Sequence, residues 1–153
     1  MKTARIIAVG KLKTGFWQQA WEYYYRQLRP WREIVLTEVR DASCQTADRN
    51  RQEGNRILGA LDSHDLPIAL VDTGKTLTSP QFARFLLDCD EKLLKTPAFI
   101  IGGPFGLDQK VLAACKTHIS LSAMTWPHEL ARVLLIEQLY RGESILHNSR
   151  YHH

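Results

Sequence analysis

A chain of 153 residues can form one ordinary domain with a buried core, and its 44% apolar and 24% charged residues are typical of a globular protein. No apolar run approaches the roughly 20 residues of a membrane span, and the short apolar start resembles a strand rather than a signal peptide, so we expect a cytoplasmic protein without membrane contact. The net charge of +4 is compatible with a polyanionic partner but does not establish one.

Strand and helix patterns alternate along the chain. In chain order, we expect a strand at 5–9, a basic loop at 11–15, a helix at 16–28, a strand at 33–39, a helix at 47–61, a strand at 67–71 closed by a turn at 72–75, a helix at 79–93, a strand at 98–101, a short helix at 109–115, a strand at 119–122 and a helix at 127–145. This order predicts an α/β fold with a largely parallel sheet and helices on both faces. Ligands of such sheets bind beyond the carboxyl ends of the strands.

The cysteines give no sign of a metal or redox site. Cys44, Cys89 and Cys115 are far apart and form no CxxC pair, so free thiols are the expected state. The acidic residues around His64 also lack the spacing of a metal site. We therefore expect no metal.

A glycine-rich segment at residues 102–106 joins a predicted strand to a predicted helix. Glycine there permits unusual backbone angles and the close approach of a ligand. The segment matches neither a Walker A loop nor the GxGxxG pattern of a dinucleotide site. A tight structural turn and a ligand-binding loop are equally good interpretations.

The segment before the last helix, residues 121–129, mixes small, apolar and aromatic side chains, and Pro127 can open the helix. It is either a connection packed into the core or a backbone-lined pocket suited to an adenine ring. His128 follows in the first helical turn, where a histidine is more often a cap than a catalyst. Arg132, four residues on, shares a helix face with His128, and this basic pair indicates a site for an anion or RNA.

Two aromatic segments have both a structural and an RNA-binding interpretation. The first helix carries aromatic side chains that could stack on bases, although packing into a core or dimer interface is the more common use. The tail at 150–153 could clamp a base and a phosphate, or be a frayed end or the remnant of a histidine tag. The residues concerned are Phe16, Trp17, Trp21, Tyr23, Tyr24, Tyr25, Arg150, Tyr151, His152 and His153.

Taken in order, these segments resemble the RlmH family, which belongs to the SPOUT class. The resemblance covers essentially the whole chain and is carried by residues 7–11, 74–75, 101–106, 121–128, 132–134, 137–141 and 151–152. No single piece is specific, whereas their combination in this order is. The family commonly has proline before its final Tyr-His pair and arginine or lysine after it; here Arg150 precedes the pair and His153 follows.

The resemblance implies a cytoplasmic enzyme that transfers a methyl group from S-adenosylmethionine to N3 of a pseudouridine in large-subunit ribosomal RNA, with the assembled ribosome as its expected substrate. It also implies a single SPOUT-like domain over residues 1–153 with a trefoil knot near its C-terminal end, which no pattern argument would predict. By motif, the cofactor contacts carry over to Leu70, Gly102, Leu121, Ser122, Ala123, Met124, Thr125 and Trp126. The RNA and target-base side carries over to His128, Arg132, Tyr151 and His152.

A homodimer is also implied by the resemblance, and Leu139 and Tyr140 on the last helix are candidates for its interface. For catalysis, a neutral His128 could take the proton from N3 of the target base, or Arg132 and the tail could stabilise the developing anion while solvent takes it; the sequence leaves both open.

Other functions compatible with these residues are a SPOUT-like methyltransferase acting on transfer RNA or another ribosomal position, an RNA-binding module without catalysis, and a small-nucleotide binder. A pure RNA binder needs no apolar adenine pocket at 121–126, so binding of the methyl donor separates these classes.

Overall fold

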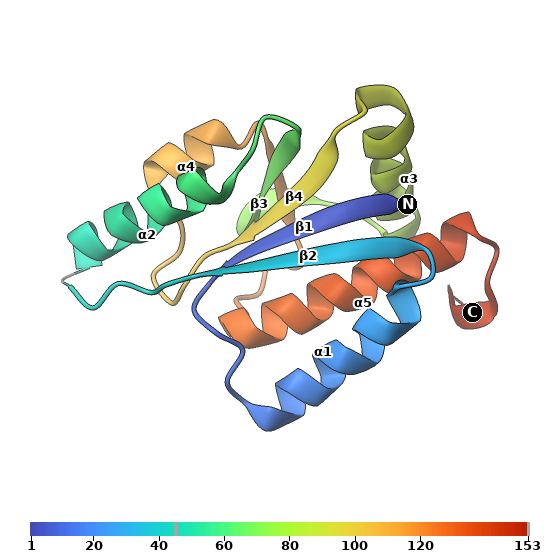
Figure 1. The fold of residues 1–153 in the computed structure, drawn as a ribbon, viewed down its shortest axis with the longest axis horizontal. Helices are drawn as coiled ribbons and strands as arrows, with labels where there is room; N and C mark the ends of the chain where they lie inside the picture. Colours follow the sequence, from blue (N-terminus) through green and yellow to red (C-terminus); the bar gives the residue numbers. More distant parts are fainter. Residues whose placement is uncertain (45, 153) are drawn as a thin grey trace.

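The structure of the protein is a computed structural model that describes residues 1–44 and 46–152. One sheet of five parallel strands runs through it in the order β2-β1-β4-β3-β5 (Figure 1). The strands are β1 (Lys2–Val9), β2 (Arg32–Val39), β3 (Asp65–Thr76), β4 (Thr96–Ile101) and β5 (Thr117–Ser120). The helices are α1 (Gly15–Leu28), α2 (Thr46–Ala60), α3 (Ser79–Asp88), α4 (Gln109–Ala114) and α5 (His128–Leu146), with a π-helical turn η1 (Cys89–Leu93) after α3 and a 3-10 turn η2 (Arg150–His152) at the end.

The predicted parallel α/β architecture is confirmed, and every strand begins one to three residues earlier than predicted. The last strand was predicted at 119–122 but spans Thr117–Ser120: its first two residues, Thr117 and His118, are polar and lie at the edge of the sheet, and Leu121 and Ser122 belong to the following loop. The expected turn at residues 72–75 is wrong in part, since β3 resumes after an interruption and pairs again with β5 through Lys75 and Thr76.

Alternating side chains of the strands build one core on each face of the sheet. From β1, Ala4, Ile6 and Ala8 pack into the core under α1, α3 and α5, whereas Ile7 and Val9 pack into the core under α2 and α4. Figure 1 shows α2 and α4 on one side of the sheet and α1 and α5 on the other. Both faces of the central strands are therefore covered, as a parallel sheet requires.

Helix α5 is the most deeply embedded helix, and its residues contradict one expectation about the dimer. Leu139 is fully buried and Tyr140 is 9% exposed, because both pack into the core beneath the sheet. Neither side chain is available for an interface between two chains, so this prediction was wrong. At the far end of α5, the buried Glu143 accepts a hydrogen bond of 2.6 Å from Nε of the buried Arg32 and ties the helix to β2.

The cysteines are free thiols, as expected. Burial raises the pKa of Cys89 to about 12 and that of Cys115 to about 11, so neither forms a reactive thiolate near neutral pH. Within residues 1–44 and 46–152, no three His, Cys, Asp or Glu side chains come together in a way that could hold a metal ion. No helix in the same ranges is both long and apolar enough to cross a membrane.

Candidate functional site

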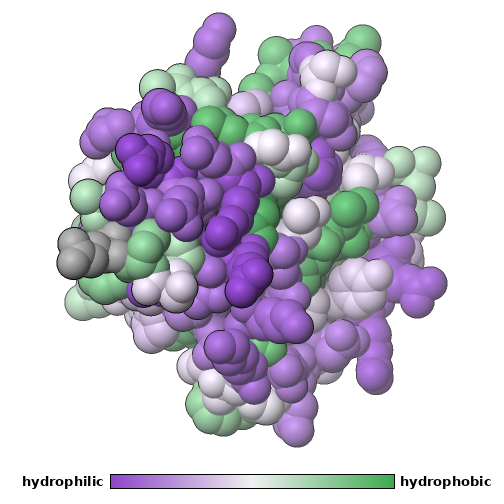
Figure 2. Space-filling view, turned by 60° about the vertical axis from the view of Figure 1, so that its left-hand side comes forward, coloured by the Kyte–Doolittle hydropathy of each residue, from purple (hydrophilic) through white to green (hydrophobic). Residues whose placement is uncertain are grey.

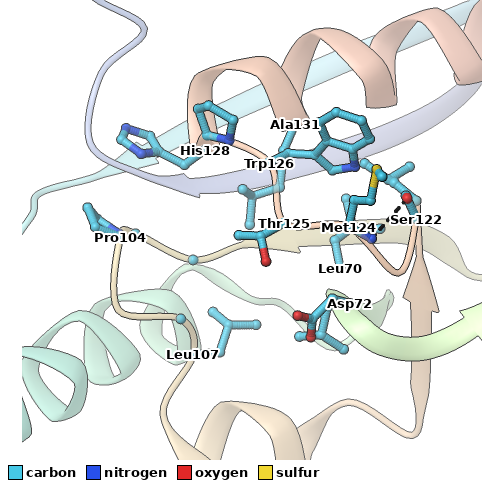
Figure 3. Close-up of a pocket in the computed structure, with 17 residues that line it drawn as sticks. Leu70, Asp72, Pro104, Leu107, Ser122, Met124, Thr125, Trp126, His128 and Ala131 are labelled. Atoms are coloured by element: carbon cyan, nitrogen blue, oxygen red, sulfur yellow. Dashed lines mark hydrogen bonds between the residues drawn. The ribbon is translucent and has the colours of Figure 1, made fainter.

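A cavity of about 600 Å³ lies beyond the carboxyl ends of β3, β4 and β5 (Figure 3). Three chain segments surround it: the interruption in β3, the glycine-rich loop after β4, and the loop from β5 to α5. This is the edge of the sheet at which ligands of parallel α/β proteins bind, and the volume suits a small organic molecule. The lining residues are Leu70, Val71, Asp72, Ile101, Gly102, Gly103, Pro104, Gly106, Leu107, Leu121, Ser122, Met124, Thr125, Trp126, Pro127, His128 and Ala131.

The first wall of the cavity is formed by the interruption in β3. Ile119 of β5 pairs with Leu70 before the interruption and with Lys75 after it, so the residues between them leave the ladder. Gly74 makes the return possible, because a Cβ atom there would lie 2.6 Å from the carbonyl carbon of Ile119. The excursion directs residues 70–72 into the cavity wall, and the contact of Leu70 with a cofactor stays a prediction.

The glycine-rich loop after β4 forms the second wall. Gly106 has a φ of +80° and donates its N–H to the carbonyl of Gly103 at 3.0 Å, which closes a tight turn. The loop is also held from outside, since Asn50 of α2 donates to the carbonyl of Phe105 at 3.0 Å and the guanidinium of Arg49 lies 5.2 Å from the Phe105 ring. The sequence left open whether residues 102–106 form a tight structural turn or a ligand-binding loop. In the structure they form a tight turn that is also a wall of the cavity.

The third wall is the loop between β5 and α5. Ser120 donates through Oγ to the carbonyl of Ser122 at 2.8 Å, and Ser122 Oγ accepts from the N–H of Met124 at 3.0 Å, so the loop holds its own shape. All of the residues predicted here for the cofactor line the cavity except Ala123, whose side chain is exposed elsewhere. Trp126 also borders a smaller cavity of about 260 Å³ between α3 and α5.

Two ionisable side chains line the cavity, those of Asp72 and His128. Asp72 is the only carboxylate among the lining residues, at a position where the sequence predicts a turn. His128 stands on the other side of the cavity from Ser122, near Pro104 (Figure 3), and its imidazole makes no hydrogen bond to the described part of the chain. An acid that directly follows a buried strand was the signal that could have identified Asp72.

Arg132 does not form the predicted basic face with His128. It is fully buried, and its guanidinium bonds to Glu38 Oε2 at 2.7 Å and to the carbonyls of Val9 at 3.1 Å and Gly10 at 2.5 Å. Helical spacing places both residues near one face of α5. His128 borders the cavity, whereas Arg132, one turn later, points into the interior of the chain. Direct contact between Arg132 and RNA, expected from the sequence, is thus contradicted by its burial in the chain.

Glu129, for which the sequence pattern predicts no role, holds the loop between β1 and α1. Its carboxylate accepts from the N–H groups of Lys13 at 2.5 Å and Thr14 at 3.1 Å, and from Thr14 Oγ1 at 2.8 Å. Desolvation acts to raise the pKa of Glu129, but these hydrogen bonds outweigh it and hold the pKa below its usual value. The carboxylate therefore stays ionised and keeps the loop beside the start of α5.

The C-terminal tail is docked rather than frayed. Tyr151 donates its hydroxyl to Glu137 Oε1 at 3.0 Å, its ring centroid lies 4.3 Å from that of Tyr140, and Arg141 lies 4.9 Å from it. His152 is half-buried, and His153 lies outside the described residues. Glu137 comes nine residues after His128, which is about 14 Å along the helix. Within one chain, the structure does not bring Tyr151 to the cavity.

A parallel α/β sheet with a ligand-sized cavity beyond its carboxyl edge defines a small-molecule-binding domain. Residues 1–152 match a family model described as "Predicted SPOUT methyltransferase". The chain belongs to this SPOUT methyltransferase family. It is 45% identical over 154 residues to "Ribosomal RNA large subunit methyltransferase H" of Lawsonia intracellularis, which covers 99% of this chain and 98% of the relative.

A protein of the same name from Nitratidesulfovibrio vulgaris, strain Miyazaki F, is 46% identical over 155 residues and covers 100% of both chains. Among solved structures, the SpoU methyltransferase AviRb from Streptomyces viridochromogenes in complex with AdoMet aligns with a TM-score of 0.48 and 8% identity, over 93% of this chain and 58% of that chain. A similarity of this size says nothing about function, which the full-length relatives address.

Proposed function

We propose that the protein transfers a methyl group from S-adenosylmethionine to N3 of a pseudouridine in large-subunit ribosomal RNA. One observation carries the proposal: relatives named as large-subunit ribosomal RNA methyltransferases match the chain from end to end at about 45% identity. The cavity supports it, because a small-molecule site lies at the family's motifs. The assembled ribosome is the proposed substrate and the cytoplasm the proposed location.

The residues present fit the methyl donor. A Cβ atom at Gly102 would come within 2.7 Å of the Gly106 carbonyl oxygen, so the loop wraps closely around a position that only glycine can occupy. We assign the adenosine to the apolar space between Gly102, Leu70 and residues 121–126. The donor supplies an already activated methyl group, so the protein has chiefly to align the two substrates.

The proton on N3 of the target base must leave when the base attacks. His128 is the cavity residue best able to accept it, because its imidazole forms no hydrogen bond to the described residues and lies at the edge of the cavity. The new bond joins N3 to the methyl carbon, the electron pair of the broken bond stays on sulfur, and His128 carries the proton away. Arg132 is too deeply buried to stabilise the developing anion by direct contact.

The direct test uses ribosomes from a strain that lacks the modification. Purified protein and methyl donor are added, the ribosomal RNA is digested to nucleosides, and the product is identified by mass spectrometry. Formation of N3-methylpseudouridine at one position is the expected result. Methylation of transfer RNA instead, or donor binding with no methylated nucleoside, would contradict the proposal.

A second test concerns the charge of the donor. The sulfonium is positive and becomes a neutral thioether after transfer, and Asp72 is the only carboxylate in the cavity lining. We expect Asp72→Asn to weaken donor binding by about 3- to 10-fold and to leave binding of the demethylated product almost unchanged, because the carboxylate is exposed and partly screened. Calorimetry with both ligands measures the two affinities. Glu33→Gln, an exposed acid at the start of β2, is the control; equal losses for both ligands would remove Asp72 from this role.

We further propose that the active form is a homodimer. If Tyr151 and His152 serve the target base, as the family motif implies, they must reach the cavity of a second chain, since Tyr151 lies about 14 Å or more along α5 from His128 in its own. The exposed aromatic side chains of α1, Phe16 at 63% and Tyr23 at 56%, are our candidates for the interface. Leu139 and Tyr140 are no longer candidates for the interface, because both are buried inside the chain.

Light scattering should give a mass of about twice 17.6 kDa at micromolar concentration. Phe16→Arg combined with Tyr23→Arg is expected to give a folded monomer, because two buried charges would not be compensated across the interface. Leu94→Arg, at a site that is 75% exposed on the turn after α3, is the matched control and should remain dimeric. A wild-type chain that is monomeric under these conditions would refute the dimer.

A further inference from the structure

We propose that Lys11, Lys13 and Arg40 form a phosphate-binding surface for the RNA strand that flanks the target nucleotide. Together these three residues form the basic rim. The inference rests on the proposed function for the identity of the nucleic acid, and on the structure for the place and the charges. It also gives Arg132 a new role, as a positioning residue that holds the rim.

The basic rim lies beside the catalytic cavity. β1 and β2 end together, since the N–H of Gly10 donates to the carbonyl of Val39 at 2.8 Å, and Lys11 and Arg40 are the next residues on the two strands. β1 also pairs with β4, and a Cβ atom at Gly103 of the cavity wall would lie 3.3 Å from Val9. A nucleic acid lying across the rim would thus pass the mouth of the cavity.

The backbone of the rim is fixed by the buried Arg132 and by two more accessible carboxylates, those of Glu38 and Glu129. Arg132 of α5 holds the carbonyls of Val9 and Gly10, and its partner Glu38 accepts from the N–H of Leu12 at 3.0 Å. Glu129 takes the N–H groups of Lys13 and Thr14, as described above. A loop of this length would otherwise be mobile, so these contacts indicate a surface that is ordered before its partner arrives.

The cationic side chains of the rim are left free by this arrangement. Lys11, Lys13 and Arg40 are all exposed, and none forms an ion pair with the described residues. The nearby carboxylates are used elsewhere: Glu38 is paired with Arg132, and Glu129 is engaged by backbone N–H groups. Asp41, the exposed acid next to Arg40, lies 3.8 Å from the guanidinium of Arg49. The three cations of the rim therefore have no carboxylate of their own as an ion-pair partner among the described residues.

The chemistry of the rim favours a phosphate backbone over an apolar partner. Hydrophilic side chains cover most of the face in Figure 2, in which the side where β1 and β2 end is turned toward the viewer, with separate apolar patches between them. Exposed lysine and arginine side chains bind phosphates and release the counterions of the nucleic acid. Contacts of this kind fix position and orientation without reading sequence, which suits a loop next to a base-specific cavity.

The experiment measures the affinity of the protein for ribosomes directly, by co-sedimentation at several salt concentrations, so that it does not depend on methyl transfer. In the triple variant Lys11→Gln, Lys13→Gln, Arg40→Gln, we expect ribosome affinity to fall by roughly 10- to 50-fold near physiological salt. The slope of log affinity against log salt should become shallower by about 2, the value for three lost contacts to single-stranded phosphates. Affinity for the methyl donor should stay within about twofold of wild type, since a contact to RNA backbone leaves the donor site untouched.

The control removes the same charge at the opposite end of the sheet, in Arg26→Gln, Arg29→Gln, Arg84→Gln, whose side chains are all exposed. An equal loss in this control, or no loss in the rim variant, would overturn the inference, even if the wild-type protein methylates ribosomes normally. The measurement is repeated on protein-free large-subunit RNA. If the difference between rim variant and wild type vanished there, the rim would contact a ribosomal protein and the phosphate-binding role would be wrong.

Glu129→Gln tests the positioning of the rim. It keeps all three cations but loosens the loop that carries two of them, so ribosome affinity should fall by several-fold while the salt slope stays close to that of wild type. Glu129→Asp, which keeps the carboxylate, should restore part of the affinity. A loss of slope equal to that of the triple variant would show that Glu129 does not act through position.

Discussion

Replacing Gly102 with valine is expected to reduce affinity for the methyl donor by about 10- to 100-fold or more. A Cβ atom at this position would lie 2.7 Å from the carbonyl oxygen of Gly106, 2.8 Å from its carbonyl carbon and 3.0 Å from Leu107 Cδ2. The loop would have to open, at a cost of about 1–3 kcal/mol for an overpacked contact, and the wall of the cavity would move with it. Calorimetric titration with the donor and with the demethylated product measures the loss.

This result depends on the protein remaining folded, which circular dichroism and thermal unfolding establish. Gly59→Ala is the matched control, because Gly59 is exposed and a Cβ atom there meets nothing within 4 Å. Gly102→Ala gives a second, milder step and guards against a valine variant that does not fold. Wild-type donor affinity in a folded Gly102→Val protein would exclude the glycine-rich loop from the donor site.

The sequence predicted the sheet well because parallel strands are recognisable as short apolar runs. Residues 98–101, for example, are buried on both sides and lie in the centre of the sheet, so their pattern had only one good interpretation. The interruption of β3 was not predictable in the same way. A strand that leaves the ladder and returns to the same partner residue, Ile119, is defined by a contact between distant segments, and only the glycine at position 74 hinted at it.

The site was predicted at the level of segments but not of individual roles. Helical spacing placed His128 and Arg132 one turn apart on α5, yet it could not show that Arg132 turns inward, since that depends on β1 and β2 packing against α5. The position of Tyr151 could not be predicted from the sequence either. Its motif suggested a base clamp, whereas its contacts with Glu137 and Tyr140 follow from the way the chain folds back on α5.

Replacing His128 with alanine is expected to slow single-turnover methylation by on the order of 100-fold or more while leaving donor binding nearly intact. The imidazole lies at the edge of the cavity and forms no hydrogen bond to the described residues, so its loss removes a proton acceptor and no structural contact. Pre-loaded protein and donor are mixed with ribosomes lacking the modification, and the methylated nucleoside is measured against time.

Three further measurements distinguish a proton acceptor from a structural residue. Added imidazole should partly restore the rate of His128→Ala, because a small base can enter the space that the side chain leaves. The control His64→Ala, an exposed residue before β3, should keep the wild-type rate. If His128 only supports the start of α5, the variant should instead lose about 1 kcal/mol of stability with little change in rate. If His128→Ala methylates at the wild-type rate without added imidazole, the proton goes to solvent. His128 is then only part of the cavity wall.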